Sequence, residues 1–260
     1  MPIQQMLLGA GAVDTIITDN LETYYDFGDS SCWDGSSTTI NDLTSNNYNA
    51  TLTGNSSNYS QSSSNGGYLD LVNTHTDRTV INRSDNNIIS TIGTGDYTLE
   101  FWINVKVGET GVDNTQMFKS YPSNGNNIRI VFRISSGTTT QLRFSPPFSG
   151  DGTWSYFPNF GSFSPGYVGW MHLVFSRIGT GSNNMKGYIN NQLKDTWTQS
   201  TDWDDAEDPS QDNSYAFGSD SASGKLIARF AVYRIYVGKG FTASEVADNY
   251  DVEKARFGLS

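Results

Sequence analysis

Glu100 is the first residue to consider for catalysis, because retaining glycosidases place two carboxylates about 5 Å apart, one as nucleophile and one as acid. Glu100 is the only carboxylate in its expected strand, where its alternate neighbours are Thr98, Trp102 and Asn104. A single Glu beside a Trp is more often a solvated or hydrogen-bonded residue of a sheet than a catalytic one. We therefore expect no catalytic residues, and a protein that is not an enzyme.

The two histidines give the second possible catalytic device, a Ser–His–Asp arrangement. His172 lies in an expected strand beside Trp170, and His75 lies in a loop with no serine elbow near it. Neither has the surroundings of a general base, so we expect His172 to be structural.

An acidic segment near residue 205 is the best candidate for a metal site. It places five carboxylates within residues 202–208, and calcium prefers several oxygen ligands from a flexible loop. The candidate ligands are Asp202, Asp204, Asp205 and Asp208. The spacing is not that of an EF-hand, and such acidic runs are also typical of solvated loops. Calcium is the only cofactor that the sequence suggests.

Aromatic residues are densest between positions 154 and 170. Exposed aromatic rings could stack on sugars, fill a subunit interface, or cover one end of the core. The candidates for a ligand site or an interface are Trp154, Tyr156, Phe157, Phe160 and Tyr167.

Composition excludes several classes of partner. The net charge is −11, from 16 Lys and Arg against 27 Asp and Glu. Nucleic-acid binding needs a basic surface, and an anionic membrane would repel this chain, so we expect neither as a partner. The single cysteine, Cys32, excludes an intrachain disulfide and is expected to be an inert thiol, either buried or half-exposed. With no signal peptide or membrane span in the sequence, we expect synthesis in a cytoplasm.

Strands must position these residues. Tyr97, Leu99, Phe101, Ile103 and Val105 alternate with the residues between them, which predicts a strand with one face in the core. Trp170–Arg177 reads as another strand, with Met185–Ile189 as its hairpin partner and a turn at Asn190–Leu193. Residues 226–237 are apolar on both faces apart from Arg229 and Arg234, which predicts a strand covered on both sides. The polar run of residues 54–67 is expected to be a surface loop.

A helix signal follows the last strand. Thr242 and Glu245 have the spacing of a capping box, with Phe241 and Val246 as a hydrophobic staple. We expect a helix from Ala243 to about Val252 that packs through Val246 and Tyr250.

Residues 1–20 form an apolar segment, and residues 21–260 form the domain. Such a segment either adds a strand to its own sheet or docks on another subunit. Its candidate docking residues are Ile3, Met6, Leu7, Leu8, Val13, Ile16 and Ile17.

With these residues in view, the chain resembles the laminin-G-like, concanavalin A-like jelly-roll superfamily. The matching segments include residues 42–52, 95–103, 169–174 and 188–193, where Asn191 stands in place of the usual glycine of the hairpin turn. The resemblance implies an all-β fold of two antiparallel sheets forming a jelly-roll sandwich, with one short C-terminal helix. Residues 1–12 and 254–258 also look like structural proteins of marine and cyanobacterial tailed phages.

These resemblances lead to two expectations for function. The first is a non-enzymatic phage virion protein, a head decoration, fibre or tail-associated component located in the virion. It would attach through residues 1–17 to other virion proteins and form a homo-oligomer such as a trimer. The alternative is a lectin-like carbohydrate-binding module that recognises a host-surface glycan and could depend on calcium.

Overall fold

The structure is a computed structural model of the chain. It describes residues 15–53, 59–71, 80–83, 95–107, 115–121, 129–135, 139–145, 155–156, 166–179, 184–196, 214–218 and 227–260. Among the strands, the side chains of β6, β8–β11 and β15 are outside this description.

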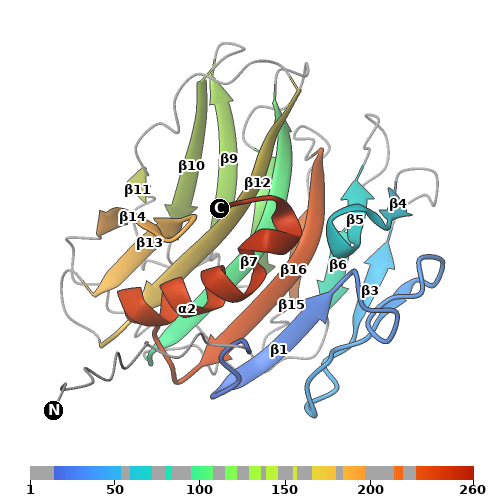
Figure 1. The fold of residues 1–260 in the computed structure, drawn as a ribbon, viewed down its shortest axis with the longest axis horizontal. Helices are drawn as coiled ribbons and strands as arrows, with labels where there is room; N and C mark the ends of the chain where they lie inside the picture. The colour runs from blue at the N-terminus through green and yellow to red at the C-terminus, as the bar shows by residue number, and fades with distance from the viewer. Residues whose placement is uncertain are drawn as a thin grey trace, which may run out of the picture.

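Two antiparallel sheets of eight strands each form the body of the domain (Figure 1). The first sheet, called here the front sheet, has this strand order: β14 (Gln192–Thr196), β13 (Met185–Ile189), β12 (Gly166–Arg177), β7 (Tyr97–Val107), β16 (Ala228–Val237), β5 (Tyr68–Leu71) and β4 (Tyr59–Ser62). Strand β1 (Leu21–Asp26) also pairs with β16.

The second sheet completes the sandwich. Its order is β11 (Ser155–Tyr156), β10 (Thr139–Ser145), β9 (Arg129–Ser135), β8 (Thr115–Tyr121), β15 (Ser214–Gly218), β6 (Val80–Arg83), β3 (Ala50–Thr53) and β2 (Thr39–Ile40). This arrangement confirms the predicted jelly-roll sandwich of two antiparallel sheets.

The inner face of the front sheet supplies most of the described core. The alternation predicted for β7 is confirmed, because its five apolar residues from Tyr97 to Val105 all lie in the core at 0–1 % exposure. Leu173 and Phe175 of β12 and Tyr233 of β16 pack in the same cluster. Cys32 is buried there, and burial raises the pKa of its thiol to about 12. The cysteine is therefore the inert thiol that was expected.

The outer face of the front sheet is covered by the C-terminal helix α2 (Ala243–Glu253) and the 3₁₀ helix η3 (Lys254–Phe257) (Figure 1). The capping box is present, since Thr242 Oγ1 accepts from the Glu245 backbone N–H and the Glu245 carboxylate accepts from the Thr242 backbone N–H. Val246 and Tyr250 are buried as predicted. Strand β16 is thus covered on both faces, which explains its apolar sequence.

Two local expectations need correction. Asn190 and Asn191 both have positive φ, at 47° and 62°, and they form a two-residue turn that joins β13 to a further strand, β14. The turn is therefore shorter than the four residues expected, while the hairpin turn with Asn191 in the glycine position, which the resemblance implies, is confirmed. Residues 54–67 are not loop throughout: β4 pairs with β5, and the 3₁₀ helix η2 (Ser64–Gly66) follows it. A polar sequence is compatible with an edge strand, because its side chains can remain exposed.

Candidate functional site

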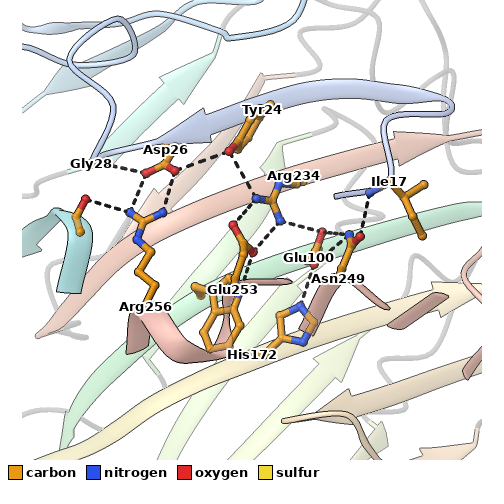
Figure 2. Close-up of polar contacts among 12 residues, drawn as sticks. Ile17, Tyr24, Asp26, Gly28, Glu100, His172, Arg234, Asn249, Glu253 and Arg256 are labelled. Carbon is orange, nitrogen blue, oxygen red and sulfur yellow. Dashed lines mark hydrogen bonds and ion pairs between the residues drawn. The ribbon is translucent and has the colours of Figure 1, made fainter. Parts of the chain in front are cut away.

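Glu100 and His172 meet on the outer face of the front sheet, beneath helix α2 (Figure 2). His172 Nε2 lies 2.7 Å from Glu100 Oε1, and both side chains are fully buried. Arg234 on β16 contacts Glu100 at 3.3 Å and pairs through two nitrogens with Glu253, near the end of α2. Asn249 of the helix donates to both oxygens of Glu100. We call these five residues the buried junction.

The electrostatics of the buried junction keep Glu100 ionised. Burial alone would raise the pKa of Glu100, but Arg234 and the hydrogen bonds from His172 and Asn249 outweigh it and lower the pKa to about 2. A carboxyl group with so low a pKa is a poor general acid near neutral pH. Its place at 0 % exposure also keeps it from a sugar substrate.

His172 is fully buried among aromatic rings. Its ring stacks on Trp102 at 4.8 Å and packs against Tyr250 of the helix at 5.8 Å. Nδ1 has no hydrogen-bond partner among the residues that the structure describes. The sequence did not indicate Glu253 as a partner of this site, because it comes from the C-terminal helix rather than from a strand.

A second polar group lies on the same outer face of the front sheet, near the start of β16. Arg229 on β16 places its guanidinium 3.7 Å from the centre of the Tyr167 ring. The Tyr167 hydroxyl donates to Asp70 Oδ1 at 3.0 Å, and Arg229 Nε donates to Asp70 Oδ2 at 3.1 Å. We call these three residues the Tyr167 cluster.

Strand register explains why the three residues meet. Arg229 faces Asp70 across the β16–β5 pair, and Tyr167 faces Lys106 across the β12–β7 pair. Their sequence neighbours Leu69 and Phe230 lie in the core and Val168 packs against it, so the cluster faces outward. The Tyr68 ring lies 5.2 Å from the Arg229 guanidinium and packs on Trp170, with ring centroids 5.4 Å apart.

The surface beside the Tyr167 cluster is accessible. The side chain of Arg229 is 29 % exposed and that of Asp70 is 14 % exposed. Strand β12 bulges between Tyr167 and Trp170, where Gly169 has φ +101°. Gly169 is exposed, and no described atom lies within 4 Å of the position that a Cβ would take. The cluster therefore combines an aromatic ring, donors and acceptors on a partly exposed part of the sheet.

The other candidate site residues have mixed positions. Tyr156 is the second residue of strand β11, and its side chain is outside the described part of the structure. Ile17 is half-buried, donates its N–H to Asn249 Oδ1, and accepts from the Tyr236 hydroxyl. The predicted residues that lie outside the described ranges are Ile3, Met6, Leu7, Leu8, Val13, Trp154, Phe157, Phe160, Asp202, Asp204, Asp205 and Asp208.

The described ranges contain neither a metal-binding cluster nor a membrane-spanning helix. No group of three or more acidic, His or Cys side chains there is arranged to hold a metal ion. Among the same residues, no helix has the length and apolar character needed to cross a membrane.

Comparison with solved structures identifies the fold. Domain 4 of AbnA, an extracellular arabinanase of Geobacillus stearothermophilus solved with arabinotriose, superposes with a TM-score of 0.61 at 21% identity over 89% of this chain and 98% of that domain. The chain has the concanavalin A-like jelly-roll fold. No protein-family model matches the sequence, and no curated protein matches it.

Two larger proteins contain the same jelly roll. The binding domain of botulinum neurotoxin serotype C1 matches with a TM-score of 0.63 at 16% identity, over 89% of this chain and 52% of that domain. A Trypanosoma rangeli sialidase matches with a TM-score of 0.61 at 10% identity, over 93% of this chain and 34% of the sialidase. The jelly roll thus spans about half of the toxin domain and about a third of the sialidase. At these identities the likeness establishes the fold and not the ligand.

Proposed function

We propose that this protein is a non-catalytic, lectin-like module that binds carbohydrate at the Tyr167 cluster. The observation that carries the proposal is the combination of a half-buried Tyr ring with a partly exposed Arg–Asp pair on the outer face of the front sheet. Sugar hydroxyls both donate and accept hydrogen bonds, and sugar C–H faces pack on aromatic rings. The cluster offers all three kinds of contact within one small area.

Structural neighbours support this proposal. The AbnA domain was solved with arabinotriose, and a further neighbour is a neurotoxin whose cell entry depends on two ganglioside molecules. The same jelly roll therefore occurs in proteins that meet carbohydrate. The expected alternative function, a carbohydrate-binding module, agrees better with these neighbours than the expected virion component does.

The virion assignment remains a prediction from the sequence. None of the neighbours described above is a phage protein, and the apolar segment on which the assignment depends lies mostly outside the described residues. A glycan-binding module could also serve a virion that attaches to a host surface. Carbohydrate binding is thus the more direct property to measure.

A glycan array probed with and without a chelator tests the proposal. We expect the wild-type protein to bind at least one class of glycan, and Tyr167→Ala to lose about tenfold or more in affinity, as removal of an aromatic anchor does. Leu193→Ala is the matched control, because Leu193 is 52 % exposed on β14, away from the cluster. Failure to bind any glycan under either condition, or unchanged binding by Tyr167→Ala, would contradict the proposal. Loss of binding with chelator alone would indicate a calcium-dependent site.

A further inference from the structure

Strand β12 carries one residue more than β7 next to the point where Tyr167 reaches the outer face. Tyr167 and Trp170 are three positions apart, but their partners on β7 are only two positions apart. Val168 and Gly169 therefore face a single residue of β7. This two-against-one pairing is a β-bulge, and bulges re-aim side chains and are over-represented beside functional sites.

The bulge determines that Tyr167 lies on the outer face of the front sheet. Val168 packs against the core, as alternation after an outward Tyr167 requires. If the residues of β12 were paired one to one instead, Val168 would lie opposite Lys106 on the outer face, and Tyr167 would turn toward the core. The contact between the Tyr167 ring and Arg229 thus depends on the bulge.

Asn104 on β7 holds the bulge from the neighbouring strand. Its Oδ1 accepts from the Gly169 backbone N–H at 3.1 Å, and the residue is only 6 % exposed. Register places Asn104 in one cross-strand row between Trp170 of β12 and Arg229 of β16. A backbone donor inside the irregular pairing is therefore satisfied by a buried side chain.

Gly169 gives the bulge its backbone conformation. Its φ of +101° lies in a region that residues with a Cβ rarely adopt. Gly169 is exposed, and no described atom lies within 4 Å of the position of a Cβ there. A side chain at this position would therefore strain the backbone without a clash against the described residues.

We infer that Asn104 is a positioning residue: by holding the β12 bulge, it keeps the Tyr167 ring on the outer face and against Arg229. Asn104 acts through the backbone of Gly169 and needs no contact with a ligand. Loss of its hydrogen bond should lower the fraction of molecules in which the Tyr167 cluster is assembled, and apparent affinity falls with that fraction. The effect on affinity rests on the proposed function, whereas the effect on Tyr167 does not.

NMR of the arginine Nε–H groups tests the inference without any glycan. The Tyr167 ring lies 3.7 Å from the Arg229 guanidinium, so its ring current shifts the Nε–H resonance of Arg229. Arg229→Lys identifies this resonance by its disappearance, and Tyr167→Ala gives its position without the ring. We expect Asn104→Ala to move it by about half or more of the difference between wild type and Tyr167→Ala, because one positioning hydrogen bond is lost.

A second variant and a control locate the effect at the bulge. Gly169→Ala strains the same bulge from β12 and should move the Arg229 resonance in the same direction. Thr98→Ala is the matched control, because Thr98 is a buried residue of β7 whose hydroxyl also accepts from a backbone N–H, that of Phe241. It should leave the resonance in place, and thermal melting confirms that each variant is folded.

Deletion of Gly169 from the Asn104→Ala variant provides a rescue. The deletion removes the extra residue, so that Tyr167 can lie opposite Lys106 by one-to-one pairing, with no bulge to hold. The Arg229 resonance should then return toward its wild-type position. If Asn104 only contributed to stability, the deletion would add a second defect and would restore nothing.

The glycan array, repeated with Asn104→Ala, measures the consequence for binding, and we expect affinity about fivefold weaker than for the wild type. An unmoved Arg229 resonance in Asn104→Ala, or no return after deletion of Gly169, would overturn the positioning role whatever the array shows. A moved resonance with unchanged glycan affinity would overturn the link between Tyr167 and binding. A moved resonance with a blank array for the wild type would overturn carbohydrate binding and support the positioning role.

Discussion

Trp102 Nε1 donates to Glu253 Oε2 at 2.7 Å, and this buried bond joins the central strand β7 to the end of helix α2 across 151 residues of sequence. The same carboxylate holds Arg234 of β16. Glu253 therefore fixes the helix to two neighbouring strands of the front sheet. Beneath helix α2, the outer face of the front sheet is therefore buried and held to the helix by ion pairs, and it does not face solvent.

We predict that Glu253→Gln destabilises the domain by about 3 kcal/mol, because it leaves the buried Arg234 guanidinium with one carboxylate where it had two. Asp251→Asn on the same helix is the control, since its ion pair with Lys254 is exposed and should change stability by less than about 0.5 kcal/mol. Urea denaturation measures both. Equal effects of the two variants would contradict the role given to Glu253.

The low pKa of Glu100 predicts a specific loss of stability in acid. Its folded pKa of about 2 lies below the ordinary value of 4.5, so ionised Glu100 stabilises the fold above about pH 4.5. This contribution, on the order of 3 kcal/mol, is lost as the pH falls from about 4.5 toward 2. The unfolding free energy of the wild type should therefore fall more steeply over this range than that of Glu100→Gln. Parallel pH profiles of the two proteins would show that Glu100 is not perturbed.

The contribution of the α2 capping box to the stability of the domain should be measurable by itself. Thr242→Ala removes the hydroxyl that accepts from the Glu245 backbone N–H and is expected to cost about 1 kcal/mol. Ser244→Ala, at an exposed position two residues further along, should be nearly neutral. If thermal denaturation gives the same melting temperature for both variants, the cap does not stabilise the helix.

Two truncations at the N-terminus should show which of its residues contribute to the stability of the domain. Removing residues 1–14 is expected to leave stability unchanged within about 0.5 kcal/mol. Removing residues 1–20 also takes away Ile17, whose backbone bonds Asn249 and Tyr236, and Asn20, whose side chain and carbonyl bond Val237.

The longer deletion leaves these partners without their hydrogen bonds, and it should destabilise the domain by about 2 kcal/mol. If the domain is as stable without residues 15–20 as with them, the hydrogen bonds of Ile17 and Asn20 do not stabilise it, and this prediction is wrong. The apolar residues before position 15 can be tested separately for docking by pull-down of partner proteins with the shorter truncation.

The amino-acid sequence by itself determined several of the elements. Period-two alternation in residues 97–105 identified the core face of β7, and two apolar faces in residues 226–237 predicted the double cover of β16. Thr242 and Glu245 fixed the start of the helix, because capping depends on residues only three positions apart. Each of these signals is local, and a single segment carries all of it.

Only the tertiary structure decided which polar residues meet. Glu100 lies far from Arg234 and Glu253 in the sequence, and the alternation of β7 placed Glu100 on the face opposite the core without showing that a helix covers it. Asp70 and Arg229 are separated by 159 residues and meet through the register of two strand pairs. Strand order and register are set by the packing of the whole sandwich, so long-range contacts of this kind have no local signature in the sequence.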